Sequence, residues 1–181
     1  MSKFKQLNNL NVKVPDMSKA QIQVYQTLIS DPKVSVDELK NLFLTSPQEV
    51  LSNSKATFHA PVDANGDPAK FEKGNFIKID IVGPMNNGYV KIHDVKSDEN
   101  SAGATFVTME GHMEKGVINF KVQGEKDGKI SFTISSASQV DMGMAPEKFS
   151  RKEQAASWNE VLNNIIKLTQ GTEERRTNHV K

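Results

Sequence analysis

One segment, from Gly103 to Ser138, constrains the fold more than any other part of the chain. It contains three runs of alternating apolar and polar residues, and Asp127-Gly128 lies in the short join between the last two runs. The apolar positions of those two runs are Ile118, Phe120, Val122, Ile130, Phe132 and Ile134. Successive side chains of a strand point to opposite faces, so this period of two predicts strands with one buried and one solvated face. Because an Asp-Gly pair suits a tight turn, we expect an antiparallel meander here.

More strands are predicted before this meander. Alternating patterns favour strands over residues 55–60, 75–82 and 89–95. A shorter alternating run over residues 10–14 ends at Pro15, which is typical of the end of an edge strand. With the three runs of the meander, this makes six strands between residues 55 and 138 and one short strand near the start of the chain.

Helical spacing and N-terminal capping patterns predict the helices. A helix is expected from about residue 18 to 30, because apolar residues recur there every three or four positions. They are Ile22, Tyr25, Leu28 and Ile29. Capping patterns at Ser35 and Ser46 predict two short helices after it. A third capping box at Ser150 opens a long C-terminal helix that ends near Gly171. Its apolar stripe consists of Ala155, Trp158, Val161, Leu162, Ile165, Ile166 and Thr169.

The order of these elements predicts an α+β fold of the helix-grip type. In that fold a curved antiparallel sheet, here of about six to seven strands, wraps around a long C-terminal helix. A cystatin-like cone is the main alternative, and it would need fewer strands before the last helix. We expect a mobile N-terminal segment over residues 1–9, a single domain over 10–171 and a polar C-terminal tail over 172–181.

A local motif agrees with this fold. The residues Gly111-His112-Met113-Glu114-Lys115-Gly116 precede a Phe-x-Val strand, and a Phe-Thr-Ile strand follows. This pattern resembles the central motif, Gly-His-x-Glu-x-Gly, of a bacterial and plant family of unknown function. That family is placed among the START-like, or birch-pollen-allergen-like, helix-grip proteins. The resemblance implies the helix-grip fold and a place for an apolar ligand, but no established chemistry.

Composition excludes several classes of function. The 181 residues include no cysteine, which rules out disulfides, thiolate catalysis and cysteine-based zinc sites. The formal net charge of +1 gives no electrostatic case for binding nucleic acid. The first residues lack the apolar core of a signal peptide, and no apolar run reaches the length of a membrane span. We therefore expect a cytoplasmic protein without membrane insertion, and leave its oligomeric state open.

A candidate ligand site is predicted between the sheet and the C-terminal helix. The apolar side chains that would line it are Ile77, Ile79, Ile81, Phe106, Phe120, Phe132, Trp158 and Leu162. The same residues would also fill an ordinary core, so a ligand cavity and a filled core both remain open. Met142 and Met144 would form an adaptable lid over such a cavity, or else an ordinary connecting loop.

Polar candidates are weaker. His112 and Glu114 lie between two glycines in a hairpin connection, where they would exchange a proton or simply hydrogen-bond the loop. The histidines show no metal-ligand spacing, so we predict neither a metal nor a cofactor. Residues 63–67 resemble the start of a calcium-binding loop, but Pro68 and Gly74 stand where such a loop needs glycine and glutamate. Turn formation explains this segment better.

Three functions remain open at this point. The first is binding of a small apolar or amphipathic molecule between the sheet and the helix. The second is a protein–protein interaction or regulatory module without a ligand. The third is an enzyme that uses His112 and Glu114 as acid and base. The fold alone does not choose among them, although nothing in the sequence anchors an enzymatic mechanism.

Overall fold

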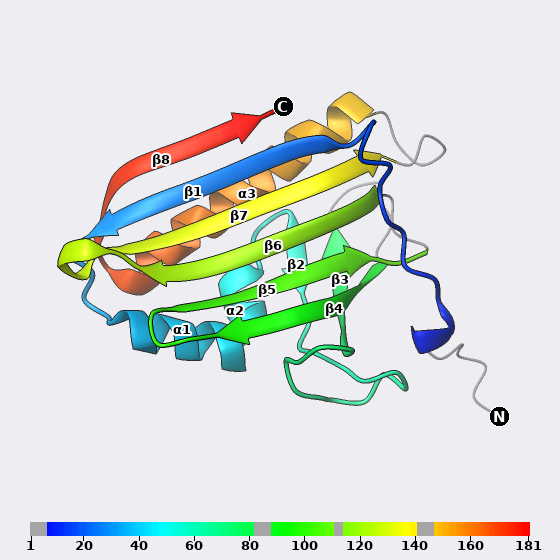
Figure 1. The fold of residues 1–181 in the computed structure, drawn as a ribbon, viewed down its shortest axis with the longest axis horizontal. Helices are drawn as coiled ribbons and strands as arrows, with labels where there is room; N and C mark the ends of the chain where they lie inside the picture. Colours follow the sequence, from blue (N-terminus) through cyan, green and yellow to red (C-terminus); the bar gives the residue numbers. More distant parts are fainter. Residues whose placement is uncertain (1–6, 82–87, 111–113, 141–146) are drawn as a thin grey trace.

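The computed structural model describes residues 7–81, 88–110, 114–140 and 147–181. The elements are a short 3₁₀ helix η1 (Leu7–Asn9), β1 (Gln21–Ser30), α1 (Val36–Thr45), α2 (Pro47–Leu51), β2 (Ala56–Phe58), β3 (Phe76–Ile81), β4 (Gly88–Ser97), β5 (Ser101–Thr108), β6 (Glu114–Gly124), the 3₁₀ turn η2 (Lys126–Gly128), β7 (Ile130–Val140), α3 (Glu147–Thr169) and β8 (Thr172–Val180). The strands form one sheet, and the three α-helices lie on the same side of it (Figure 1).

The sheet has eight antiparallel strands in the order β2-β3-β4-β5-β6-β7-β1-β8. Strands β2 to β7 follow one another along the chain, whereas β1 is inserted between β7 and β8 near the opposite edge. The helix-grip α+β class predicted from the sequence is confirmed. The sheet has more strands than the six to seven expected, because residues 21–30 and 172–180 form strands β1 and β8, which were not predicted.

The predicted meander is confirmed as β5, β6 and β7. In the register of β6 and β7, Phe120 lies opposite Ile134 and Val122 lies opposite Phe132, and all four side chains are buried. The turn between the two strands is η2, in which Asp127 and Gly128 have φ angles of 62° and 74°. An Asp-Gly pair tolerates this left-handed conformation, which explains why the sequence signal for the hairpin was reliable.

The helix predicted over residues 18–30 is wrong, because residues 21–30 form strand β1. Burial alternates along this strand, with Gln23, Tyr25, Thr27 and Ile29 on the buried face. Two of these four side chains are polar, so the apolar residues alone do not show the period of two. The apolar residues on which the helix prediction rested, Ile22, Tyr25, Leu28 and Ile29, recur at helical spacing instead.

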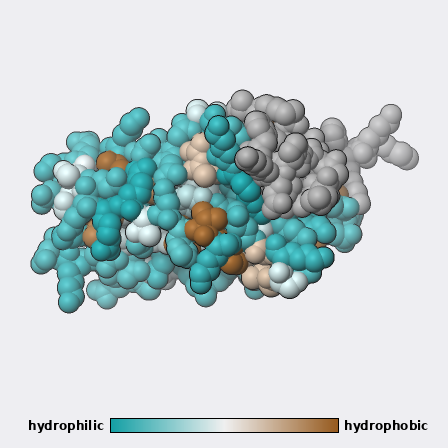
Figure 2. All heavy atoms as spheres, turned by 90° about the horizontal axis from the view of Figure 1, so that it is seen from above, coloured by the Kyte–Doolittle hydropathy of each residue, from teal (hydrophilic) through white to brown (hydrophobic). Residues whose placement is uncertain are grey.

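The polar tail predicted over residues 172–181 is also wrong as a structural description, because residues 172–180 form the edge strand β8. This strand pairs with β1 from Gln23–Val180 to Ser30–Thr172. Nearly all of its side chains are exposed, so no apolar pattern marks it in the sequence. Seen from above, over this edge of the sheet, the surface is mostly hydrophilic with small separate hydrophobic areas (Figure 2). Polar side chains of this kind protect an edge strand from unwanted pairing.

Polar contacts hold β8 against the rest of the molecule. The Thr27 hydroxyl donates a hydrogen bond of 2.6 Å to the Glu173 carboxylate, which also accepts one of 2.8 Å from Arg176 Nε. Arg176 reaches further to α3, where its Nη2 donates to Asn163 Oδ1 at 2.6 Å. The predicted helix end near Gly171 is confirmed, since α3 ends at Thr169.

The two short helices predicted after Ser35 and Ser46 are confirmed as α1 and α2. The Ser35 hydroxyl caps α1 by accepting a hydrogen bond of 3.1 Å from the Glu38 amide. Ser46 precedes Pro47 at the start of α2, but its side chain makes no capping bond. The proline alone therefore marks that helix start.

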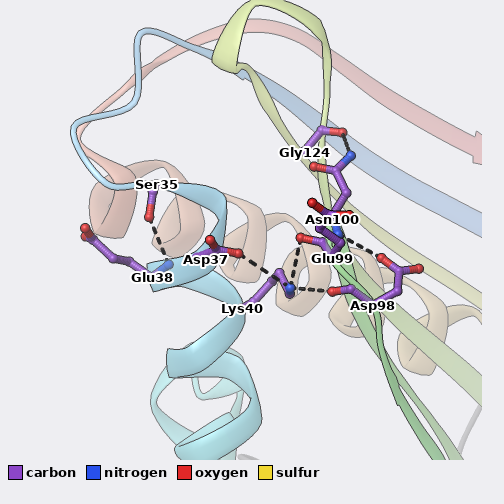
Figure 3. Close-up of polar contacts among 8 residues, drawn as sticks. All are labelled: Ser35, Asp37, Glu38, Lys40, Asp98, Glu99, Asn100 and Gly124. Carbon is purple, nitrogen blue, oxygen red and sulfur yellow. Dashed lines mark hydrogen bonds and ion pairs between the residues drawn. The ribbon is translucent and has the colours of Figure 1, made fainter.

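A buried lysine joins α1 to the β4–β5 hairpin (Figure 3). Lys40 is only 9% exposed, and its Nζ donates to the carbonyl oxygens of Asp98 and Glu99. In the same hairpin Asn100 Nδ2 donates to the Gly124 carbonyl at 2.7 Å, which ties the end of β6 to the turn. These contacts fix α1 over one end of the sheet.

The ends of the predicted segments need three further corrections. The short strand expected over residues 10–14 is reduced to a single bridge between Val12 and Met109. Residues 7–9, expected to be mobile, form η1, and Leu7 is buried with Phe76 and Met109 in a small second cluster. Helix α3 begins at 147, three residues before the predicted cap. Residues 1–6, and Met142 and Met144 in the expected lid, lie outside the described residues.

Candidate functional site

The interior between the sheet and the helices is organised around a closed ring of five phenylalanines. Successive ring centroids lie 5.4 to 6.4 Å apart, in the range of favourable edge-on and tilted aromatic pairs. In order around the ring they are Phe43, Phe71, Phe106, Phe120 and Phe132. Trp158 of α3 packs edge-on against Phe120 at 5.8 Å. The aromatic ring therefore joins α1, the β2–β3 loop, the sheet and α3.

All eight side chains predicted to line a ligand site lie in this one interior cluster. Six of them are buried, namely Ile77, Ile79, Phe106, Phe120, Phe132 and Leu162. Ile81 and Trp158 are partly buried and pack against the others. The structure thus brings the predicted residues together. Whether they bind a ligand stays a prediction.

A buried polar network continues this interior toward the first turns of α3. The Tyr25 hydroxyl donates a hydrogen bond of 2.6 Å to Gln23 Oε1, and Gln23 Nε2 donates to Gln154 Oε1 on α3. Tyr25 and Gln23 are each only 2% exposed. Burial raises the pKa of the Tyr25 phenol, although the positive charge of Arg151 partly opposes this shift.

Arg151 forms the other half of the polar network. Its guanidinium donates to the Ser138 hydroxyl, to the Ser138 carbonyl at 2.8 Å and to Gln154 Oε1 at 3.1 Å. Ser138 is 2% exposed and lies near the end of β7. A guanidinium holds several donors in one plane, so this contact fixes the start of α3 against the sheet.

The three elements that face one another share a gradient from polar to apolar side chains. The inward positions run Gln23, Tyr25, Thr27, Ile29 along β1; Ser138, Ser136, Ile134, Phe132, Ile130 along β7; and Arg151, Gln154, Trp158, Leu162, Ile165 along α3. In the β1–β7 register the polar ends coincide, because Gln23 lies opposite Ser136 and Ile29 lies opposite Ile130. The interior is thus amphipathic along its length.

Sequence reasoning did not find this polar end. The alternation of Ile130, Phe132 and Ile134 does continue to Ser136 and Ser138, and that continuation was the available signal. Their partner Gln23 lay in the segment predicted as a helix, so the sequence offered no reason to place it beside them.

The polar residues that were predicted as candidates contribute less. His112 lies outside the described residues, and Glu114 begins β6 opposite Val140 in the register. His59 forms a 2.6 Å contact with Asp80 on the neighbouring strand, which lowers the pKa of that carboxyl. Across the described parts of the chain, no three His, Asp or Glu side chains gather as a metal site would require.

Residues 63–67 form a turn. Asp63 Oδ1 accepts hydrogen bonds from the amides of Asn65 and Asp67, at 2.8 and 3.1 Å, and Gly66 has a φ of 84°. The carboxylate thus bonds its own backbone, as aspartates in turns commonly do.

The outer face of the sheet carries a separate hollow of about 270 Å³ over β4, β5 and β6. Its lining includes Asp94, Lys96, Gly103, Asn119 and Lys121. A side chain at Gly103 is disfavoured, since a Cβ there would approach the Phe120 carbonyl oxygen to 2.9 Å. The lining mixes both charges and points away from the aromatic ring.

An antiparallel sheet packed on a long C-terminal helix defines the START-like helix-grip class, and three solved structures share the fold. A hypothetical protein of Helicobacter pylori has a TM-score of 0.62 at 7% identity, over 93% of this chain and 99% of that one. A START superfamily protein of Mycobacterium smegmatis has a TM-score of 0.55 at 9% identity, over 83% and 97%. The major latex-like protein 151 of ginseng, Panax ginseng, has a TM-score of 0.52 at 18% identity, over 82% and 97%.

The chain belongs to the family described as a domain of unknown function, DUF1990, whose model matches residues 44–163. The predicted relation to START-like proteins is confirmed at the level of the fold, whereas the role of the Gly-His-x-Glu-x-Gly motif stays a prediction. No curated protein matches the sequence. Within the described part of the chain, no helix has the length and apolar character needed to cross a membrane.

Proposed function

We propose that the protein binds a small apolar or amphipathic molecule between the inner face of the sheet and α3. The observation that carries this proposal is the shared gradient of β1, β7 and α3, from Gln23 and Arg151 at one end to the phenylalanine ring at the other. Ligand sites are mostly apolar, with a few polar groups that orient the bound molecule. The gradient has this character.

The free-energy cost of burying polar side chains supports the same proposal. A buried polar network contributes less to stability than apolar packing of the same volume, and it is costly wherever one partner is missing. Gln23, Ser136 and Ser138 nevertheless place polar side chains on the inner faces of two neighbouring strands. A ligand with one polar end would explain why polar side chains lie at these positions.

The first test is mass spectrometry of the protein purified from cells, under conditions that preserve bound molecules, followed by analysis of an organic extract. We expect an added mass that disappears on extraction and reappears as an apolar compound. A mass equal to that of the bare chain, together with no thermal shift against a lipid and metabolite panel, would favour the interaction-module hypothesis instead.

The second test uses Trp158 as the reporter, because it is the only tryptophan of the chain. The neutral apolar dye N-phenyl-1-naphthylamine accepts excitation energy from tryptophan and brightens in apolar surroundings. We expect saturable dye emission on excitation of Trp158. Dye emission that rises linearly without saturation would contradict the proposal.

A pair of variants locates the dye. Ala104 faces the interior on β5, opposite Phe120, whereas its neighbour Thr105 lies on the other face. We expect Ala104→Leu to weaken dye binding by filling the interior, and Thr105→Leu to leave it unchanged. Undiminished binding by Ala104→Leu, in a protein that still unfolds cooperatively, would place the dye elsewhere.

A further inference from the structure

Two buried polar atoms at the boundary between the polar network and the phenylalanine ring lack hydrogen-bond partners. They are Ser136 Oγ and Trp158 Nε1, and neither has a partner among the residues that the structure describes. Ser136 as a whole is only 7% exposed. Buried polar groups in folded proteins are nearly always paired, and an unpaired one destabilises the fold. Two such atoms on residues near the same Phe120 ring suggest a group that pairs with them.

The two atoms belong to residues of facing elements, and both residues lie near Phe120. Ser136 lies on the inner face of β7, two residues from Ile134, which is the register partner of Phe120. Trp158 projects from α3 and packs edge-on against the same Phe120 ring. The unpaired atoms thus come from the sheet and from the helix, at the point where the interior changes from polar to aromatic.

The chemistry of these atoms restricts the group that would satisfy them. An indole Nε1–H can only donate a hydrogen bond, while a serine hydroxyl donates one and accepts others. Both can donate to a single oxygen acceptor. Arg151 lies about two turns before Trp158 on α3. It adds a positive charge at the polar end while it keeps its hydrogen bonds to Ser138.

We propose that the ligand carries an oxygen acceptor, a carboxylate or a carbonyl, which accepts hydrogen bonds from Trp158 Nε1 and Ser136 Oγ while its apolar part lies among the phenylalanines. This inference rests on the proposed function and adds the orientation and chemical class of the ligand. Entry of the acceptor requires α3 to move away from β7 locally, because both unpaired atoms are enclosed by the surrounding side chains.

Three compounds of one shape test the acceptor. They are 2-naphthoate, 2-acetylnaphthalene and 2-ethylnaphthalene, which present a carboxylate, a carbonyl and no oxygen. Isothermal titration calorimetry gives their affinities for the full chain. We expect the oxygen-bearing compounds to bind about tenfold more tightly than 2-ethylnaphthalene, as one well-placed buried hydrogen bond provides. A preference for 2-naphthoate over 2-acetylnaphthalene identifies the acceptor as a carboxylate, and equal affinities of the two identify it as a carbonyl oxygen.

Two substitutions assign the effect to the unpaired atoms. Trp158→Phe keeps an aromatic ring but removes the donor, and Ser136→Ala removes only the hydroxyl. We expect each to reduce the tenfold advantage of the oxygen-bearing compounds over 2-ethylnaphthalene, which is compared within the same variant. Ser135→Ala is the matched control, because Ser135 lies on the opposite face of β7.

The outcomes separate the two proposals. Equal binding of all three compounds, or an advantage that survives both substitutions, overturns the acceptor and leaves the ligand site in place. Dye binding without binding of either oxygen-bearing compound would likewise overturn the acceptor and leave the ligand site in place. Failure of the dye and of all three compounds to bind overturns the proposed function itself.

Discussion

Ser136 carries a hydroxyl that is enclosed on the inner face of β7 and unpaired among the described residues. Because an unpaired buried hydroxyl costs about 1–3 kcal/mol, Ser136→Ala should raise the free energy of unfolding by about 1 kcal/mol in the absence of ligand. Urea denaturation of the variant beside Ser135→Ala measures the difference. A loss of stability would mean that the hydroxyl has a partner, such as a buried water, even without ligand.

Gly171 occupies a position where the backbone leaves no room for a side chain. A Cβ there would overlap Ile29 Cγ2 and would lie 2.9 Å from the Ser30 carbonyl oxygen. We expect Gly171→Ala to lower the free energy of unfolding by about 1–3 kcal/mol, the usual cost of overpacking. The exposed neighbour Thr172 provides the control, and equal stabilities of Gly171→Ala and Thr172→Ala would show that the chain can shift to make room.

At the scale of elements, Lys40 links α1 to the β4–β5 hairpin through two backbone carbonyls. Replacing it by methionine keeps most of the volume and leaves those carbonyls without their charged donor. Lys40→Met should therefore lower the free energy of unfolding by about 1.5–3 kcal/mol, measured by urea denaturation. Asn41→Met, at an exposed position of the same helix, should change it little; similar losses in both variants would argue against the link.

Strand β8 depends on the ionised form of Glu173. Burial alone would raise the pKa of this carboxyl, but the hydrogen bonds from Thr27 and Arg176 outweigh burial and hold the pKa below its usual value of 4.5. A pKa lowered by folding contributes stability above the unfolded value, and that contribution disappears as the pH falls through the folded value. We expect the wild type to lose more stability than Glu173→Gln between pH 6 and pH 3. The measurement is urea denaturation at both pH values. Parallel losses would contradict the role of Glu173.

Elements with a mostly apolar inner face were predictable, whereas β1 and β8, with polar or exposed faces, were not. In β6 and β7 the alternation of phenylalanine, valine and isoleucine gives a clear period of two, and α3 has a regular apolar stripe. β1 has Gln23 and Thr27 on its buried face, which hid the period, and β8 is mostly exposed and carries no apolar pattern. The apolar half of the candidate site was predicted for the same reason. Its polar half requires knowing that β1 lies beside β7, which no local pattern indicates.

For the whole molecule, we expect this pairing of distant segments to limit the folding rate. Gln21 pairs with Ser138, and Gln23 pairs with Val180, so two ladders of the sheet close loops of more than a hundred residues. Proteins dominated by such long-range pairings fold in milliseconds to seconds. We expect refolding on this scale in stopped-flow dilution from urea, followed through Trp158 fluorescence. Refolding within microseconds would show that the ladders of β1 do not limit the rate.

The position of β1 also affects how the chain is made. During synthesis β1 leaves the ribosome about a hundred residues before its partner β7, and β8 follows later still. A newly made β1 therefore remains unpaired on both edges until those residues have been added. Exposed apolar strands in that state are prone to aggregate. The glutamine and threonine on the inner face of β1 reduce that hazard, so the same polar side chains that concealed the strand in the sequence protect it while the rest of the protein is being synthesised.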